Sequence, residues 1–285
     1  MVRRNSFWYY LLLLFALFTA LCVLAPYYWM LVTSISLPRD LTARPLRLFP
    51  VNISFDRYLS IFSGSAASDS PAHVFKVSMK NSLIVSLSVT AVSLVVGSLA
   101  SYAFARLRFR FRNGLIMLTI FTYMIPSVAL VIPMYMIFSS LGMLDQKHTL
   151  VLLYLSVIIP FVIWVMQGFF GSLSRSFEEA AEIDGCSRFQ TLWYIFLPLA
   201  RPGLIATALL SFLMSWDEFF FSLIFTSSLN AKTITIAVSE FNGKYSIDYG
   251  MISAAGILAS IVPMLIVMLF QRYIVTGMTS GGIKE

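Results

Sequence analysis

Six long stretches of this chain carry almost no charged residues, and they limit what the chain can fold into. Each exceeds the roughly 20 residues that a helix needs to cross the hydrocarbon core of a bilayer. In lipid only helices and closed β-barrels satisfy their backbone polar groups, and these stretches lack the alternation of barrel strands. The stretches are 5–38, 81–105, 113–144, 148–174 and 249–271, with 202–231 interrupted only by Asp217 and Glu218.

The stretches predict an all-α polytopic membrane protein with six transmembrane helices in a single domain, residues 1–285. A content of 59% hydrophobic and only 12% charged residues agrees, since an ordinary soluble domain has roughly 25% charged residues. The apolar run after Arg3 and Arg4 is too long for a cleavable signal peptide, so we expect a retained first span. The predicted spans are 7–34, 80–105, 114–140, 149–171, 204–228 and 249–271.

The loops between these spans indicate an orientation. Four arginines stand in the short RLRFRFR segment that follows the second span, and such a loop resists translocation. We therefore expect both termini and the 172–203 loop on the cytoplasmic side, with the 35–79 loop outside. Cys22 and Cys186 predict neither a disulfide framework nor a metal site.

Residues 176–202 form the least hydrophobic internal loop and read as two short helices joined by a turn. Ser176 with Glu179 predicts one capping box, and Ser187 with Gln190 a second. Gly185 between them suits the left-handed end of a helix. The predicted apolar faces are Phe177, Ala180 and Ala181 on the first helix, and Phe189, Leu192, Trp193 and Phe196 on the second.

The same loop carries a family signature. Glu179-Ala180-Ala181, then Gly185, then Ile195 with Leu197-Pro198 match the pattern E-A-A-x3-G-x9-I-x-L-P. The chain resembles the permease subunits of carbohydrate ABC importers, specifically the second, six-span permease of the maltose type. NSLIVSLSVT at 81, SYAFARLRFRFRN at 101, SWDEFFFSLIF at 215 and the terminal QRYIVTGMTSGGIKE also resemble that family, so the likeness covers essentially the whole chain.

The resemblance implies a type I ABC importer permease fold with cytoplasmic EAA coupling helices, in a bacterial or archaeal cytoplasmic membrane. It implies a heterodimer with a second permease, two ATPase subunits that bind ATP and Mg, an extracytoplasmic solute-binding protein and a carbohydrate substrate. It implies no nucleic-acid partner, no catalytic residue and no cofactor held by this chain. Contact with the ATPase would fall on Glu178, Glu179, Ala180, Ala181, Asp184, Gly185, Arg188, Ile195, Leu197 and Pro198, and through the tail on Gly281, Gly282 and Ile283.

Polar and aromatic residues within the spans are candidates for a translocation pathway. Asp217 and Glu218 stand near the middle of the fifth span, where a charged residue costs roughly 3 kcal/mol on insertion scales. Many relatives have Asn at the position of Asp217. An interfacial location or pairing with the partner permease would explain both carboxylates equally well. The other candidates are Asn81, Tyr123, Gln167, Trp216 and Phe220, for which helix packing is the plainer alternative.

Three other functions remain to be weighed against a sugar importer. A related solute such as glycerol phosphate would suit the same chain. An ion-coupled secondary transporter would need intramembrane ionisable groups, which Asp217 and Glu218 supply, but it would have no reason to carry the EAA loop. A membrane-embedded hydrolase is disfavoured because neither H-E-x-x-H nor G-x-S-x-G occurs. No G-x-x-x-x-G-K-[ST] occurs either, so active transport would need a separate ATPase.

Overall fold

The structure is a computed structural model that describes residues 6–41, 48–50, 52–63, 70–241 and 248–280. Among these residues the regular secondary structure is helical, with an isolated antiparallel bridge between Ser36 and Ile53. It divides into two compact units, 1–75 with 237–260 and 76–236 with 261–285. The long helices are α1 (Ser6–Ile35), α4 (Pro71–Arg106), α7 (Lys147–Ser172), α11 (Arg201–Trp216) and α14 (Tyr249–Ser280).

The first unit is built around the end of α1, whose apolar side chains remain exposed along most of its length. The predicted 35–79 loop contains α2 (Pro38–Leu41) and α3 (Asp56–Ser63), and α4 begins at Pro71 rather than at residue 80. In α3 the guanidinium of Arg57 donates to the carbonyls of Ser34 and Ser36 at 3.2 and 2.6 Å. It also pairs with Asp248 at 3.3 Å, so one side chain joins the end of α1 to the start of α14.

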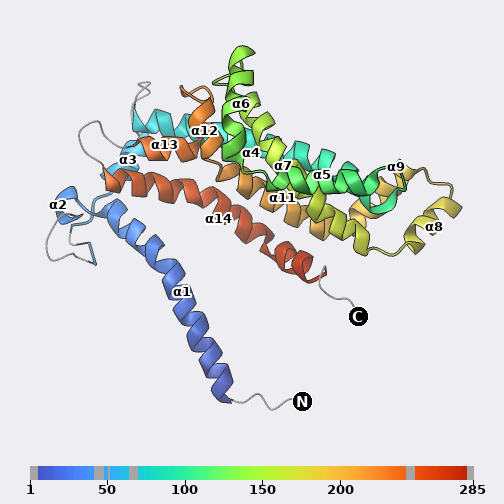
Figure 1. Cartoon of the computed structure of the whole chain (residues 1–285). Helices are drawn as coiled ribbons and strands as arrows, with labels where there is room; N and C mark the ends of the chain where they lie inside the picture. Colours follow the sequence, from blue (N-terminus) through green and yellow to red (C-terminus); the bar gives the residue numbers. More distant parts are fainter. Residues whose placement is uncertain (1–5, 42–47, 51, 64–69, 242–247, 281–285) are drawn as a thin grey trace. The chain divides into compact units, whose positions relative to one another are not determined.

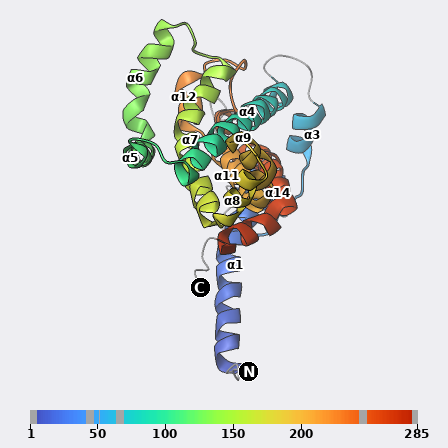
Figure 2. The same cartoon turned by 90° about the vertical axis from the view of Figure 1, so that its right-hand side faces the viewer.

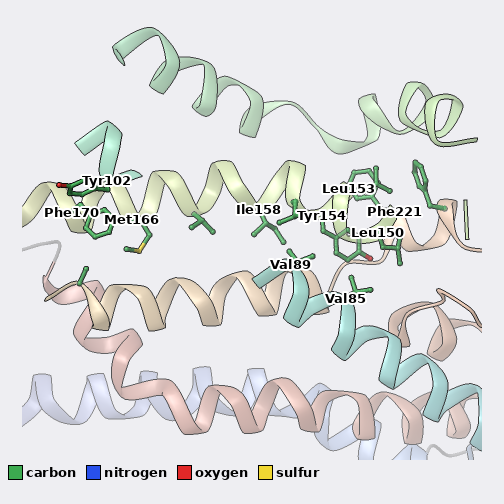
Figure 3. Close-up of a cluster of buried hydrophobic side chains, with 14 of the residues drawn as sticks. Val85, Val89, Tyr102, Leu150, Leu153, Tyr154, Ile158, Met166, Phe170 and Phe221 are labelled. Atoms are coloured by element: carbon green, nitrogen blue, oxygen red, sulfur yellow. The ribbon is translucent and has the colours of Figure 1, made fainter. Parts of the chain in front are cut away.

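The second unit has its core between α4, α7 and α11. Side chains of α4 and α7, among them Val85, Val89, Leu153 and Tyr154, meet Phe221 in one buried cluster (Figure 3). Close helix approach depends on small residues: a Cβ at Gly97 would lie 2.4 Å from a methyl carbon of Val162. The small residue Gly97 therefore lets α4 pack closely against α7.

The third predicted span, 114–140, is not one straight helix. Instead α5 (Arg112–Met124) and α6 (Ser127–Ser140) meet at an angle of 91° (Figures 1 and 2). Pro126 follows the break at Ile125, and Pro disfavours helical geometry in the residue before it. Pro133 lies within α6 and Pro160 within α7 without ending either helix.

The fifth predicted span, 204–228, is also divided. The 16 residues of α11 end at Trp216, and α12 (Phe220–Phe225) follows after a break at 217–219. Glu218 explains the restart, because its carboxylate accepts the backbone N–H groups of Phe221 and Ser222 at 2.9 and 3.2 Å. A short helix α13 (Ile234–Glu240) follows.

Four described helices are long and apolar enough to cross a membrane, and up to six spans result if each bent helix pair is counted as one. The two bent pairs are α5 with α6 and the 188–199 helices with α11, the latter at 80°. The upper count agrees with the six spans that the sequence predicts, although a charge-free stretch reports hydropathy and does not reveal where the backbone turns.

Candidate coupling site

The loop with the EAA signature lies at the end of the second unit where α7 ends and α11 begins (Figure 1). It contains two helical segments, as the sequence predicts. The first is α8 (Ser176–Ile183). The second is a continuous run of α9 (Arg188–Thr191), a π-helical turn η1 (Leu192–Phe196) and α10 (Leu197–Leu199).

The start of α8 differs from the prediction. Ser176 is the first helical residue and not the N-cap, and Arg175 at the N-cap position provides no side-chain cap. The Ser174 hydroxyl instead accepts the Ser176 N–H at 3.3 Å and bonds the Ser176 hydroxyl at 2.8 Å. The capping box of Ser176 with Glu179 is therefore wrong, because two serines compete for the helix start and the earlier one takes it. Glu179 is left free to face solvent.

The faces of α8 also differ from the prediction. Ala181 is 1% exposed, whereas Ala180 and Phe177 are exposed, so these three residues do not form one apolar face. Glu179 lies on the open side with Ala180, while Glu178 is half-buried. Ile183 is 86% exposed on the same open side, four residues after Glu179. The outward face of α8 thus consists of Glu179, Ala180 and Ile183. On this face a carboxylate lies beside an exposed aliphatic side chain.

The turn after α8 follows its glycine. Gly185 has φ +77°, and a Cβ there would meet nothing within 4 Å, so backbone conformation alone requires glycine. The Cys186 N–H bonds the Ala181 carbonyl at 2.9 Å and the Gly185 N–H bonds the Glu182 carbonyl at 3.1 Å, which is the Schellman pattern. Asp184, just before the glycine, is exposed.

The second segment begins as predicted. The Ser187 hydroxyl accepts the Gln190 N–H at 3.3 Å, and the Gln190 side chain accepts the Ser187 N–H at 2.8 Å, so the capping box is confirmed. Arg188 is exposed and pairs with Glu182 at 3.2 Å, with both side chains more than half exposed.

The predicted apolar stripe on this segment is split. Leu192 and Phe196 are buried, but Phe189 and Trp193 are 63% and 58% exposed and stack on one another with ring centroids 6.3 Å apart. Residues 189 and 193 are four apart and share one strip of the helix surface, while 192 and 196 share the neighbouring strip, and only the second strip is buried. Pro198, which lacks an N–H, is the second residue after the π-helical turn.

The last residues of the signature anchor the loop. Ile195 and Leu197 are half-buried against the core of the second unit, and Pro198 is exposed. Most of the ten predicted coupling residues that are exposed to solvent therefore lie in the first helix and the turn. The Ile-x-Leu-Pro end of the signature packs the loop against the core of the second unit.

Arg106 is a residue of this site that the sequence marked only as a basic loop residue. It ends α4, its side chain is 5% exposed, and it donates to the carbonyls of Phe170 and Leu173 at the end of α7. Its guanidinium carbon lies 4.9 Å from the ring centroid of Phe196, and it faces Glu178 at 3.9 Å. A cleft of about 850 Å³ opens beside it, lined by five arginines and two glutamates: Arg106, Arg108, Arg112, Arg175, Arg188, Glu178 and Glu182.

The pathway candidates in α4, α5 and α7 lie in separate surroundings. The Asn81 amide is 3% exposed and donates to the carbonyls of Leu229 and Lys232 at 2.9 and 3.0 Å. Tyr123 on α5 is 42% exposed and lies near the ring of Phe161. Gln167 on α7 is half-buried, and its side chain makes no hydrogen bond to another described residue. Among the described residues no hydrogen bond or ring contact joins these three side chains, and their role in a pathway stays a prediction.

The remaining pathway candidates surround the break between α11 and α12. Trp216 is buried and stacks on Phe212 with centroids 5.6 Å apart, and Phe220 is half-buried. Asp217 is exposed, while Glu218 caps α12 as described above. A helix broken within a span is where transporters place polar groups, so these four residues stay candidates. Gly281, Gly282 and Ile283 lie outside the described residues.

Comparison with known proteins identifies the family. Residues 75–280 match the family of binding-protein-dependent transport system inner membrane components. The chain belongs to this family of ABC importer permeases. It is 33% identical, over 92% of its length and 89% of the relative's, to the sulfoquinovosyl glycerol transport system permease SmoH of Agrobacterium fabrum. It is 32% identical, over 96% of both chains, to the trehalose/maltose transport system permease MalG of Thermococcus litoralis.

Solved structures agree with this fold. A chain of a bacterial ABC transporter involved in the import of the acidic polysaccharide alginate matches with a TM-score of 0.78 and 25% identity, over 96% of this chain and 98% of that one. The protein is therefore an all-α, multi-pass permease of the inner membrane with the ABC importer fold. The prediction of fold class and family is confirmed.

Proposed function

We propose that this chain is one of two permease subunits of an ATP-driven importer for a sugar or oligosaccharide. The proposal is supported by relatives whose names specify sulfoquinovosyl glycerol, trehalose/maltose and trehalose transport. The chain forms half of the translocation pathway, with a second permease as the other half. Two ATPase subunits bind ATP and Mg on the cytoplasmic side, where both termini of this chain also lie, and an external binding protein delivers the solute.

The observation that carries the proposal is the outward face of α8. Ile183 is 86% exposed on a short helix held in place by a Schellman turn, and Glu179 and Ala180 stand beside it. A bare aliphatic side chain beside a small residue and a carboxylate suits a protein interface, whose centre is apolar and whose rim is polar. The ATPase subunit docks on this face, and its movements reach the spans through the loop.

Substitution of Ile183 tests the docking assignment. We expect Ile183→Lys to reduce the amount of ATPase that co-purifies with a tagged permease at least about tenfold, since a charge would enter a buried contact. Ile183→Val is the matched control and keeps co-purification within about twofold. Glu179→Lys reduces it as well. Wild-type co-purification by Ile183→Lys and Glu179→Lys would show that the ATPase docks elsewhere.

The solute class needs a separate experiment. The intact complex in vesicles, with its binding protein, is given maltose, trehalose, an alginate oligosaccharide or glycerol 3-phosphate, and the ATPase rate is measured. A neutral sugar is expected to raise the rate most. Stimulation by glycerol 3-phosphate alone would replace the sugar with the alternative solute, and uptake that follows an ion gradient without ATP would favour a secondary transporter.

A further inference from the structure

One guanidinium at the end of α4 contacts three other elements of the second unit, α7, α8 and η1. Arg106 ends α4, donates to two carbonyls at the end of α7, faces Glu178 in the first turn of α8, and covers the Phe196 ring in η1. Carbonyls at a helix C-terminus carry partial negative charge, so a cation is stabilised there. Any displacement of α8 relative to α4 and α7 must therefore change the surroundings of this one side chain.

The two adjacent glutamates of α8 face opposite ways. Glu179 is exposed on the outward face, whereas the side chain of Glu178 is 16% exposed and faces Arg106. The sequence assigns both to contact with the ATPase. Burial separates them, because a carboxylate that faces the spans contributes little to an external interface.

The Arg106–Glu178 contact is incomplete. The carboxylate oxygen Oε2 lies 3.9 Å from the nearest guanidinium nitrogen, while Oε1 of Glu178 and Nε of Arg106 are buried without a hydrogen-bond partner among the described residues. A bidentate arginine–carboxylate pair has N···O distances of about 2.8 Å. A shift of α8 by roughly 1 Å would bring Oε2 of Glu178 within hydrogen-bond distance of the nearest guanidinium nitrogen of Arg106, so an open and a closed arrangement of the same groups are available.

We propose that Arg106 and Glu178 form the internal link through which movement of α8 reaches the ends of α4 and α7. This proposal rests on the proposed docking of an ATPase at α8 and adds the residue that passes the motion inward. Arg106 acts as a positioning residue: it holds the helix ends in one arrangement while the pair is open, and in another when α8 moves and the pair closes. Glu178 therefore serves coupling and not docking.

Glu178→Gln in the intact complex tests the link, because glutamine keeps the shape and removes the charge. Co-purification of the ATPase is expected to stay within about twofold of wild type. The stimulation of ATP hydrolysis by the binding protein, loaded with the solute that stimulates the wild-type complex most, is expected to fall about tenfold. A purely structural role would lower the yield or melting temperature of the complex and leave this stimulation factor unchanged.

Glu182→Gln is the matched control, since Glu182 also pairs with an arginine, but both side chains of that pair are about 60% exposed. It is expected to keep the wild-type stimulation factor. Arg106→Lys supplies a second variant that retains the charge. Its single ammonium cannot serve both the α7 carbonyls and the carboxylate as a fork does, so stimulation is expected to fall about threefold to tenfold.

Two results would overturn the link. If Glu178→Gln released the ATPase as Ile183→Lys is expected to, Glu178 would be a docking residue. If Glu178→Gln and Arg106→Lys both kept wild-type stimulation, the pair would be static packing. Failure of the ATPase to co-purify with the wild-type chain would instead count against the docking assignment itself, so the two failures are distinguishable.

Discussion

Arg57 and Arg106 occupy equivalent local settings in the two units, yet only one of their contacts is closed. Each donates to carbonyls at the C-terminal end of a long helix, α1 for Arg57 and α7 for Arg106, and each faces a carboxylate from another helix or its flank. Both side chains are largely buried, at 11% and 5% exposed. The same guanidinium geometry thus serves to join helix ends twice in one chain.

The difference lies in the carboxylate. Asp248 lies 3.3 Å from Arg57 and also accepts the Met251 N–H at 3.0 Å, which caps α14. Neither Arg57 nor Asp248 has a buried polar atom without a partner among the described residues, whereas Arg106 and Glu178 each have one. A cluster whose buried polar atoms all have hydrogen-bond partners loses bonds when it is displaced. A cluster with unpaired polar atoms can form additional hydrogen bonds in a second arrangement. We therefore call Arg57 a clamp, because it holds the end of α1 and the start of α14 in one arrangement. We call Arg106 a link, because in the proposal above its contacts change when α8 moves.

Arg57→Ala should give the largest effect on stability. Loss of the side chain leaves the α1 carbonyls and Asp248 without their cation, at a cost of about 2–4 kcal/mol. This loss of stability is small for the breaking of a buried ion pair, because the Asp248 side chain is 44% exposed and water can solvate its charge. The melting temperature of the purified complex should fall clearly, while the complexes that survive keep the wild-type stimulation of ATP hydrolysis. A selective loss of stimulation at unchanged stability would erase the distinction between clamp and link.

Gly250→Ala tests the same Arg57 contacts by placing a methyl group against the guanidinium from α14. A Cβ at Gly250 would lie 2.0 Å from the guanidinium carbon of Arg57, so the guanidinium must move and its contacts weaken. We expect a loss of about 2 kcal/mol, measured by thermal unfolding. Gly256→Ala in the same helix is the control, because its Cβ would meet only the Met30 sulfur at 3.6 Å, an ordinary contact. Equal stability of the two variants would mean that Arg57 is loosely held.

Asp145 extends the comparison to a satisfied carboxylate in the same unit as Arg106. It lies in the turn between α6 and α7, where it accepts the N–H groups of Ser227 and Ser228, each at 3.0 Å, and the Ser228 hydroxyl. Partial burial raises the pKa of Asp145, but the hydrogen bonds from Ser228 and Ser227 outweigh it, so the pKa lies below its ordinary value.

The pH dependence follows from that direction. A carboxylate whose folded pKa is lowered stabilises the protein above its unfolded pKa of about 3.9, and this contribution is lost as the pH falls through the folded pKa. The melting temperature should therefore show no Asp145 contribution to its slope between about pH 5 and 8. Asp145→Asn should cost about 1 kcal/mol throughout that range, since the site is partly open to solvent. A loss of stimulation in Asp145→Asn would show that satisfied contacts also transmit motion.

Much of the fold could be predicted from local pattern. Hydropathy predicted an all-helical membrane protein, because each apolar stretch must satisfy its own backbone in lipid, whatever its neighbours do. Gly185 and the Ser187–Gln190 box were also predictable, since turns and caps depend on residues within one helical turn. The divided fifth span had a visible signal in Asp217 and Glu218, but only the structure shows that Glu218 caps a new helix.

The inner side of the coupling site could not be predicted in the same way. RLRFRFR contains four arginines at similar spacing, and which one is buried depends on carbonyls 64 and 67 residues further along the chain. Glu178 is likewise half-buried and Ile183 exposed because of how α8 packs in three dimensions, which residues within α8 do not specify. Ile183 had a weak signal of its own, an isoleucine that did not fit the predicted apolar face.

The two predicted capping boxes offer the smallest test, because only one of them forms. Ser187→Ala removes the hydroxyl that caps α9 and should cost about 0.5–1 kcal/mol locally. Ser176→Ala should cost less, since Ser176 is not the N-cap of α8 and its hydroxyl bonds only that of Ser174. Hydrogen exchange at the Gln190 amide, which the Ser187 hydroxyl accepts, measures the difference, and faster exchange is expected only in Ser187→Ala. If Ser176→Ala instead loosened α8 and lowered the stimulation of ATP hydrolysis, the link through Glu178 would depend on how α8 begins as well as on Arg106.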